Sequence, residues 1–148
     1  MENKYDSLEL KNQLCFPIYL CSKEIIRKYI PILNELNLTY TQYIVMMYFW
    51  EKKKSNVKDI AKTLLLDSST LTPLLKRLET KGFITRDRSS FDERNLNICI
   101  TKKGMNLRDK ALIIPKKMSN CLNLSNEEAE MLYNLIYKVL NNTIKEEE

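Results

Sequence analysis

The residues best suited to chemistry in this sequence are four cysteines, Cys15, Cys21, Cys99 and Cys121. A cysteine thiolate reacts with peroxides and disulfides, and its surroundings decide how readily the charged form is present. The spacing of the four cysteines is unlike that of a disulfide scaffold, and no Cys-x-x-Cys pair indicates zinc. The polar start of the chain, MENKYDSLELKNQ, does not resemble a secretory signal. We therefore expect a cytoplasmic protein with reduced thiols.

Cys15 has surroundings that suit a sensing thiol. It precedes Pro17, a residue favoured in the first turn of a helix, and a helix that restarts there would place its positive end beside the sulfur. Tyr19 follows four residues later on the same helix face, from which its hydroxyl can donate to a thiolate. The residues alone leave open that Cys15 is a buried, unreactive thiol. Cys21 lies about 9 Å further along a continuous helix, which disfavours a disulfide with Cys15.

The composition excludes most enzyme classes. The 148 residues include no histidine, so a histidine base, triad or zinc ligand is absent, and only two glycines, too few for a glycine-rich phosphate loop. Hydrophobic residues make up 44% of the chain, and no apolar run reaches the roughly 18–20 residues of a membrane span. We expect one globular domain over residues 1–148 that is not an enzyme and that binds no metal, cofactor or membrane.

The positive charge is concentrated in the middle of the chain. Residues 52–110 contain fifteen basic and seven acidic residues, whereas the remainder contains nine basic and twelve acidic ones. A basic middle between mildly acidic ends indicates a surface for a polyanion on one part of the fold. A lysine-rich, solvated surface is the alternative.

The hydrophobic spacing predicts a mainly helical, α+β fold. The first 35 residues read as a helix with an apolar stripe from Leu10 to Ile32, interrupted early by Pro17. A second helix spans residues 41–50, with Ile44, Met47 and Tyr48 on one side. Residues 102–122 are helical again, and a capping-box spacing at residues 125–128 begins a last helix.

The basic middle has the pattern of a winged helix-turn-helix. Leucines at 71, 74, 75 and 78 form the buried face of a helix that Asp67 or Ser68 caps, and Val57, Ile60, Ala61 and Leu64 form that of the helix before it. After Gly82 the period changes to two, which predicts strands over residues 83–86 and 95–101. The charged segment between them, DRSSFDER, is then the tip of a wing.

The expected recognition helix and wing carry side chains suited to DNA. Small hydroxyls at the start of the helix and cations further along match phosphates and base edges in a major groove, and wing arginines match a narrow minor groove. Asp92 can orient Arg94 through a bidentate pair, although the spacing taken alone favours an ordinary turn ion pair. The candidate DNA-binding residues are Ser68, Ser69, Thr70, Thr72, Pro73, Lys76, Arg77, Arg86, Arg88, Asp92 and Arg94.

The segments outside this core, about residues 1–38 and 105–148, are long helices with apolar stripes. The winged core, about residues 39–104, offers them no partner, so a two-fold homodimer is the simplest way to bury them. Packing of these helices on their own domain is the alternative.

The segment LLLDSSTLTPLLKRLETKGFITRDRSSFDERNLNICITKKG resembles the signature of the MarR family of winged helix-turn-helix regulators, with the Asp92-x-Arg94 wing as its most specific part. The preceding QLCFPIYLCSKEIIRKYIPILNELNLTYTQY resembles the peroxide- and oxidation-sensing branch that includes OhrR, SarZ and MgrA. The resemblance implies that Cys15 is the sensor. It also implies that Tyr19, Tyr29 and Tyr40 hold its thiolate, some of them from the partner subunit.

The resemblance further implies a possible resolving thiol. Two-cysteine members of this branch carry a second cysteine about as far downstream as Cys121, which pairs across the dimer with the sensor. Two departures from the family pattern stand out. Ser69 replaces a usual glycine, and Pro17 replaces a usual aliphatic residue.

We therefore expect a homodimeric repressor that binds a pseudo-palindromic, double-stranded DNA operator while Cys15 is reduced. An organic hydroperoxide or another oxidant would convert Cys15 to a sulfenic acid and then to a disulfide with Cys121 or a low-molecular-weight thiol. The alternatives are a MarR-type regulator released by a small aromatic ligand, with Cys15 silent, and a winged-helix adaptor that does not bind DNA. A thiol peroxidase or reductase is disfavoured because it leaves the basic winged core unexplained.

Overall fold

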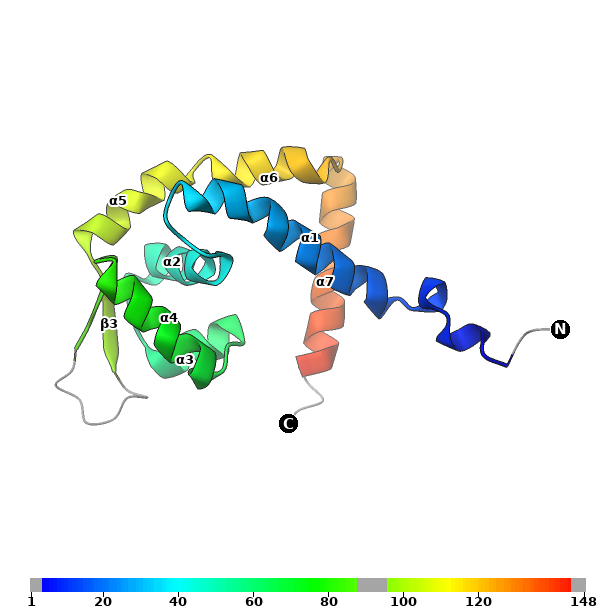
Figure 1. Cartoon of the computed structure of the whole chain (residues 1–148), viewed down its shortest axis with the longest axis horizontal. Helices are drawn as coiled ribbons and strands as arrows, with labels where there is room; N and C mark the ends of the chain where they lie inside the picture. The colour runs from blue at the N-terminus through cyan, green and yellow to red at the C-terminus, as the bar shows by residue number, and fades with distance from the viewer. Residues whose placement is uncertain (1–3, 88–95, 145–148) are drawn as a thin grey trace. The chain divides into compact units, whose positions relative to one another are not determined.

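The structure is a computed structural model that describes residues 4–87 and 96–144. The chain divides into two compact units, Met1–Leu112 and Ile113–Glu148. Within its described part, the first unit contains five α-helices, two 3₁₀ turns and three short strands. Figure 1 shows how these elements follow one another along the chain. The elements of the first unit are η1 (Asp6–Leu8), η2 (Leu10–Asn12), α1 (Cys15–Asn34), α2 (Tyr40–Lys52), β1 (Lys54–Asn56), α3 (Val57–Leu64), α4 (Ser68–Thr80), β2 (Ile84–Arg86), β3 (Asn97–Ile100) and α5 (Lys102–Ala111).

Helix α1 begins at Cys15, later than the apolar stripe suggests. The prediction of a helix over the first 35 residues is wrong before this point, because η1 and η2 are single 3₁₀ turns. Pro17 lies in the first turn of α1, where backbone N–H groups have no helical acceptor, so it does not interrupt the helix. Pro31 lies inside α1 with its ring exposed.

Helix α2 is fixed at its start by a capping box. The Thr39 side chain accepts from the Gln42 backbone N–H, and the Gln42 side chain accepts from the Thr39 N–H. Its most deeply buried apolar side chains are Val45, Met46 and Phe49. Ile44 and Tyr48 are only half-buried and Met47 is exposed, so the side on which their spacing places them is not the buried face of α2. Because α2 is apolar on nearly all sides, the sequence pattern does not identify its buried face.

Helices α3 and α4 form the predicted helix-turn-helix. Leu71, Leu74, Leu75 and Leu78 are all buried, as expected from their spacing. The chain leaves α3 through Leu65 in a left-handed conformation, which turns it sharply toward α4. Asp67 then caps α4 with its side chain.

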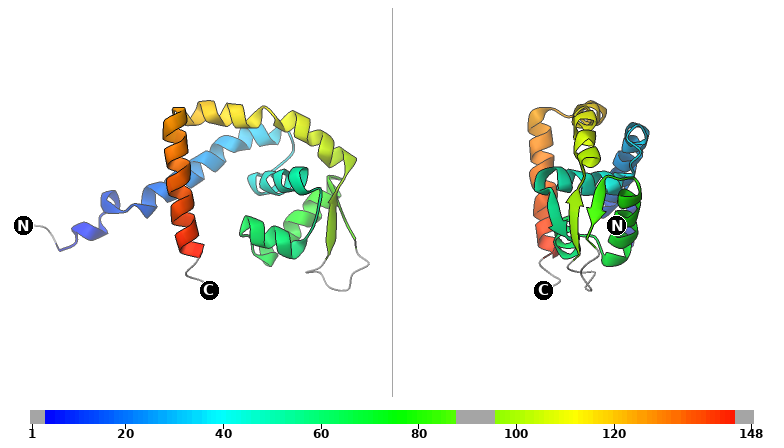
Figure 2. Two further views of the ribbon diagram at one scale, coloured as in Figure 1. Left: turned by 180° about the vertical axis from the view of Figure 1, so that it is seen from behind. Right: turned by 90° about the vertical axis from the view of Figure 1, so that its left-hand side faces the viewer.

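Three short antiparallel strands form the base of the wing, in the order β1-β3-β2 (Figure 2). The strands β2 and β3 were expected from the sequence, whereas β1 was not. Cys99 lies in the middle of the sheet, paired with Lys54 on one side and Thr85 on the other.

The start of α5 is packed closely against the wing. A Cβ added to Gly104 would overlap the backbone oxygen of Phe83, so only glycine fits this position. The indole N–H of Trp50 donates to the Gly104 carbonyl oxygen at 2.9 Å. These contacts join α2, the wing and α5 into one lobe.

The second unit contains α6 (Ile114–Leu122) and α7 (Asn126–Ile144). The helix expected over residues 102–122 is interrupted before Ile114, and Pro115 occupies the first turn of α6. The predicted capping box precedes α7. Ser125 accepts from the Glu128 N–H at 3.2 Å, and Glu128 accepts from the Ser125 N–H at 2.8 Å. No helix in the described part of the chain is long and apolar enough to cross a membrane.

Candidate functional site

Cys15 and Tyr19 lie one turn apart at the start of α1. Cys15 is the first residue of the helix, where backbone N–H groups lack helical acceptors, and its side chain is exposed. Tyr19 is 57% exposed. The ammonium of Lys23, one further turn along the same face, lies 5.2 Å from the centroid of the Tyr19 ring. The structure thus gathers a thiol, a phenol and a positive charge on one exposed stripe.

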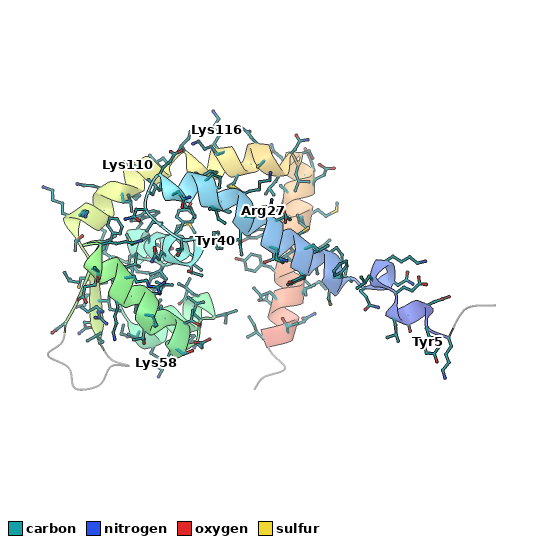
Figure 3. The ribbon with its side chains drawn as sticks, in the orientation of Figure 1. Tyr5, Arg27, Tyr40, Lys58, Lys110 and Lys116 are labelled. Atoms are coloured by element: carbon teal, nitrogen blue, oxygen red, sulfur yellow. The ribbon has the colours of Figure 1, made fainter. Side chains whose placement is uncertain are left out.

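Tyr29 and Tyr40 form a second group where α1 and α2 meet. Tyr40 is labelled in Figure 3. The ring centroids of Tyr29 and Tyr40 are 4.8 Å apart, and the ring of Tyr43 lies 5.9 Å from that of Tyr29. Burial raises the pKa of Tyr29, and Tyr40 raises it further. Burial and these two neighbours raise the pKa of Tyr43 as well. Tyr29 and Tyr43 therefore stay protonated at neutral pH and can donate hydrogen bonds.

The two groups lie far apart on one helix. Cys15 and Tyr29 are separated by fourteen positions of α1, which corresponds to about 21 Å along the helix axis. The structure brings Cys15 together with Tyr19, and Tyr29 together with Tyr40. It does not bring the two pairs together within a single chain.

A hollow of about 440 Å³ opens beside Tyr40. Its walls come from the second half of α1 and from the start of α2. The lining residues are the apolar or aromatic Ile26, Ile30, Leu38 and Tyr40 and the polar Asn34, Thr39 and Thr41.

The remaining cysteines are not paired in the structure. Cys21 lies on the same continuous helix as Cys15, and both thiols are free and exposed. Cys99 is half-buried in β3, and Cys121 is exposed near the end of α6. Within the described residues, no group of three or more cysteine or acidic side chains could hold a metal ion.

The start of α4 presents hydroxyl groups in a fixed arrangement. The Asp67 carboxylate accepts from the Ser69 hydroxyl at 2.5 Å, from the Thr70 backbone N–H at 2.7 Å and from the Thr70 hydroxyl at 3.2 Å. These hydrogen bonds lower the pKa of Asp67. The cap therefore orients two of the predicted DNA-binding side chains, a role that the sequence analysis did not anticipate.

The predicted DNA-binding residues of α4 lie on its exposed side, opposite the buried leucines. Ser68, Ser69 and Thr70 are exposed in the first turn, and Thr72 is half-buried beside them. The exposed residues further along the helix are Pro73, Lys76 and Arg77.

The wing is described only in part. Arg86 lies on β2, and its guanidinium donates to the Glu79 carboxylate from Nε at 2.9 Å and from Nη2 at 2.8 Å. This pair was not predicted from the sequence, in which its only signal is a seven-residue spacing across the turn at Gly82. The other predicted DNA-binding residues of the wing, Arg88, Asp92 and Arg94, lie outside the described residues.

Comparison with known sequences indicates a family of transcriptional regulators. A family model described as "Transcriptional regulator SarA/Rot" matches residues 27–111. The chain is 44% identical to the organic hydroperoxide resistance transcriptional regulator of Bacillus subtilis over 140 residues. These residues make up 95% of each of the two chains. The chain is 45% identical over 142 residues to the HTH-type transcriptional regulator SarZ of Staphylococcus saprophyticus, which covers 93% of this chain and 96% of the relative.

Comparison with solved structures confirms the predicted winged-helix fold. The reduced form of AbfR bound to DNA, a Staphylococcus epidermidis protein, matches with a TM-score of 0.75 and 32% identity over 96% of this chain and 99% of that chain. The disulfide form of AbfR matches with a TM-score of 0.65 and 33% identity over 95% and 96% of the two chains.

Proposed function

Because the chain belongs to the SarA/Rot family of MarR-like winged-helix transcriptional regulators, we propose that it is a repressor that releases DNA when Cys15 is oxidised. The proposed signal is an organic hydroperoxide or another oxidant, and the proposed target is a pseudo-palindromic operator in double-stranded DNA. The name of the Bacillus subtilis relative and the reduced, DNA-bound and disulfide forms of AbfR support this function. The protein is a cytoplasmic regulator and not an enzyme.

The observation that carries this proposal is that Cys15 and Tyr19 lie at the start of α1, whereas Tyr29 and its neighbour Tyr40 on α2 lie about 21 Å further along the helix axis. When two copies of a helix pack antiparallel about a two-fold axis, the start of one lies beside the end of the other. Cys15 and Tyr19 of one chain then face the partner subunit's Tyr29 and Tyr40. The protonated Tyr29 hydroxyl is suited to hold a thiolate by donating to it.

Exposed apolar side chains support a homodimer. These include Leu14, just before α1, and Ile18, Leu20, Ile26 and Ile30 on α1, which are between 38% and 73% exposed. Helix α7 has no buried residue although its spacing is that of an amphipathic helix. Soluble monomers rarely expose apolar surface of this extent, and such surface marks a site of interaction with a partner. The apolar residues exposed on α7 are Met131, Leu132, Tyr133, Leu135, Ile136, Tyr137, Val139, Leu140 and Ile144.

The proposed switch begins with attack of the Cys15 thiolate on the peroxide. The thiolate displaces an alkoxide from the distal peroxide oxygen, which gives a cysteine sulfenic acid and an alcohol after one proton is taken up. A second thiol then attacks the sulfenic sulfur and releases water, which leaves a disulfide. We propose Cys121 of the partner subunit or a low-molecular-weight thiol as this second thiol.

The proposed DNA-binding surface is the exposed side of α4. Ser69 and Thr70, oriented by Asp67, and the exposed cations Lys76 and Arg77 form a row along the helix that fits a major groove. Two such helices in a dimer must match two half-sites about one helical turn apart. Oxidation that moves the helices out of this spacing lowers the affinity.

The deciding experiment measures operator binding by the reduced protein before and after one equivalent of an organic hydroperoxide. We expect the wild-type affinity to fall by about tenfold or more, and Cys15→Ser to keep its affinity, since typical coupling free energies are 1–3 kcal/mol. Cys21→Ser is the matched control, and it should respond as the wild type does. Equal loss of binding by Cys15→Ser and the wild type would contradict the proposal.

The second thiol is identified by the mass of the oxidised protein. With Cys121 as the resolving residue, oxidation produces a species of twice the 17.5 kDa chain under non-reducing conditions, and Cys121→Ser abolishes it. If the oxidised chain instead gains the mass of an added small thiol in both proteins, the resolving role of Cys121 is wrong and the mixed disulfide stands.

The hollow beside Tyr40 favours one alternative function. Its apolar walls and volume suit a small aromatic ligand that would release DNA with Cys15 silent. In that case an aromatic acid or phenol releases the operator without oxidant, and Cys15→Ser responds as the wild type does.

A further inference from the structure

Lys81 joins the end of the recognition helix to the corner between α1 and α2. Its ammonium donates to the backbone oxygen of Asn37 at 2.6 Å and to the side-chain oxygen of Gln42 at 2.9 Å. Lys81 caps the C-terminal end of α4, and these two acceptors lie 44 and 39 positions earlier in the chain. One side chain therefore spans two elements that are remote in sequence.

The corner that Lys81 contacts is itself held rigidly. Asn37 has a positive φ of 55°, and Leu38 donates its backbone N–H to the Leu33 oxygen at 3.1 Å, which closes the end of α1. The capping box of Thr39 and Gln42 then starts α2. Residues 37–42 thus form one hydrogen-bonded corner, and Lys81 is attached to both of its ends.

This corner also carries a residue of the proposed sensing site. Tyr40 lies within it, and its ring packs against that of Tyr29. A displacement of Tyr40 moves the backbone that Lys81 holds, because the corner has little freedom to deform on its own. The contact is thus a direct physical route from the sensing tyrosines to α4.

One of the two acceptors of Lys81 is deeply buried. Gln42 is 2% exposed, the only polar side chain buried in the described part of the chain, and its oxygen accepts from both Lys81 and the Thr39 N–H. Burial and the nearby charge of Arg77 lower the pKa of Lys81. The end of α4 is also held from the other side, where the Lys103 ammonium donates to the Lys81 carbonyl oxygen at 2.8 Å.

We propose that Lys81 is the positioning residue that couples the state of the sensing site to the orientation of the recognition helix. This inference rests on the proposed redox function. It assigns to Lys81 neither a contact with the oxidant nor a contact with DNA. Without Lys81, oxidation of Cys15 proceeds but no longer displaces α4.

Three variants distinguish a role of Lys81 in coupling the sensing site to α4 from an effect on stability or on net charge. Lys81→Met removes both hydrogen bonds and keeps an apolar stem of similar length, whereas Lys81→Arg keeps the charge and the donors. Lys110→Met makes the same change in charge at an exposed position of α5, which is labelled in Figure 3.

The first measurement compares operator affinity in the reduced and oxidised states and follows the loss of the free Cys15 thiol. We expect Lys81→Met to consume its thiol at the wild-type rate while its reduced-to-oxidised affinity ratio falls from about tenfold or more to below about threefold. Lys81→Arg and Lys110→Met should keep the wild-type ratio. An unchanged ratio in Lys81→Met, even with weaker binding in both states, would overturn the proposal.

The second measurement needs no oxidant. Because coupling free energies are reciprocal, we expect operator binding to slow amide hydrogen exchange in residues 37–42 of the reduced wild type. We expect this protection to be lost in Lys81→Met and kept in Lys81→Arg. Equal protection in Lys81→Met and the wild type would contradict the coupling role. If wild-type binding instead proves insensitive to oxidant, the proposed redox function fails, and this exchange measurement still decides the role of Lys81.

Discussion

Arg86 is held by one acidic side chain through three hydrogen bonds. Its Nε and Nη2 atoms and its backbone N–H all donate to the Glu79 carboxylate, at 2.9, 2.8 and 3.2 Å. The two side chains are only 11% and 24% exposed. The pair therefore fastens the first wing strand to the last turn of the recognition helix, and little of the guanidinium is left for a nucleic acid.

We expect Arg86→Met to lower the free energy of unfolding by about 2 kcal/mol, because the half-buried Glu79 carboxylate loses charged donors. Urea denaturation measures this change. In Arg86→Met, the slope of log operator affinity against log salt concentration should equal that of the wild type. In the exposed Lys76→Met, the magnitude of this slope should fall by about 1. A slope that falls by about 1 in Arg86→Met would instead support the phosphate contact predicted from the sequence.

At the scale of elements, the first turn of α4 depends on the ionised state of Asp67. Its pKa is lowered from 3.8 by the hydrogen bonds from Ser69 and Thr70. A carboxyl whose folded pKa is lowered stabilises the fold above its unfolded pKa, and this contribution is lost as the pH falls through the folded value. The charge of the cap is thus fully present at neutral pH, and its contribution is lost progressively in acid, as the pH falls below the ordinary pKa of a carboxyl toward the lowered pKa of Asp67.

The matched variant is Asp67→Asn, because asparagine also caps helices but does not titrate in this range. We expect the wild type to unfold at a higher temperature than Asp67→Asn at pH 7, with the difference shrinking steadily toward pH 3. Thermal unfolding followed by circular dichroism measures both proteins. A difference that stays constant with pH would show that the charge of Asp67 contributes nothing to the cap.

At the scale of the whole molecule, the apolar side chains of α7 require a partner surface. Within one chain Leu132 and Ile136 are 47% and 49% exposed, although they lie on the apolar stripe of an amphipathic helix. A second copy of the chain, related by two-fold symmetry, is the partner that we propose for them.

We therefore expect Ile136→Glu to weaken dimerisation, because a carboxylate in an apolar interface loses its hydration without compensation. Sedimentation should show the wild type at twice the mass of the chain and the variant shifted toward a single chain. Operator affinity should fall with it, since each half-site requires its own recognition helix. Lys138→Glu on the same helix is the control and should remain dimeric. An Ile136→Glu protein that is fully dimeric would remove α7 from the interface.

Elements with a clear hydrophobic period were predictable from the sequence. The leucines of α4 are buried as their spacing requires, and the alternation around Ile98 identified β3. Strand β1 gives no such signal because Lys54, Ser55 and Asn56 are all polar, and only the pairing of its backbone with β3 identifies it as a strand.

Within the candidate site, only the arrangement of residues that lie on the same helix was predictable from the sequence. The spacing of Cys15 and Tyr19 placed both on one face of α1, and the structure agrees. The packing of Tyr43 against Tyr29 and the attachment of Lys81 to Gln42 depend on how separate helices meet. Periodicity along the chain contains no information about such contacts.

The separation of the sensing residues along α1 has a genetic consequence. If each sensing site combines Cys15 from one chain with Tyr29 and Tyr40 from another, a mixed dimer of a Cys15→Ser chain and a Tyr29→Phe, Tyr40→Phe chain contains one doubly defective site and one intact site. Two alleles that are each unresponsive alone should then complement each other when they are expressed together. A site confined to a single chain would show no such complementation.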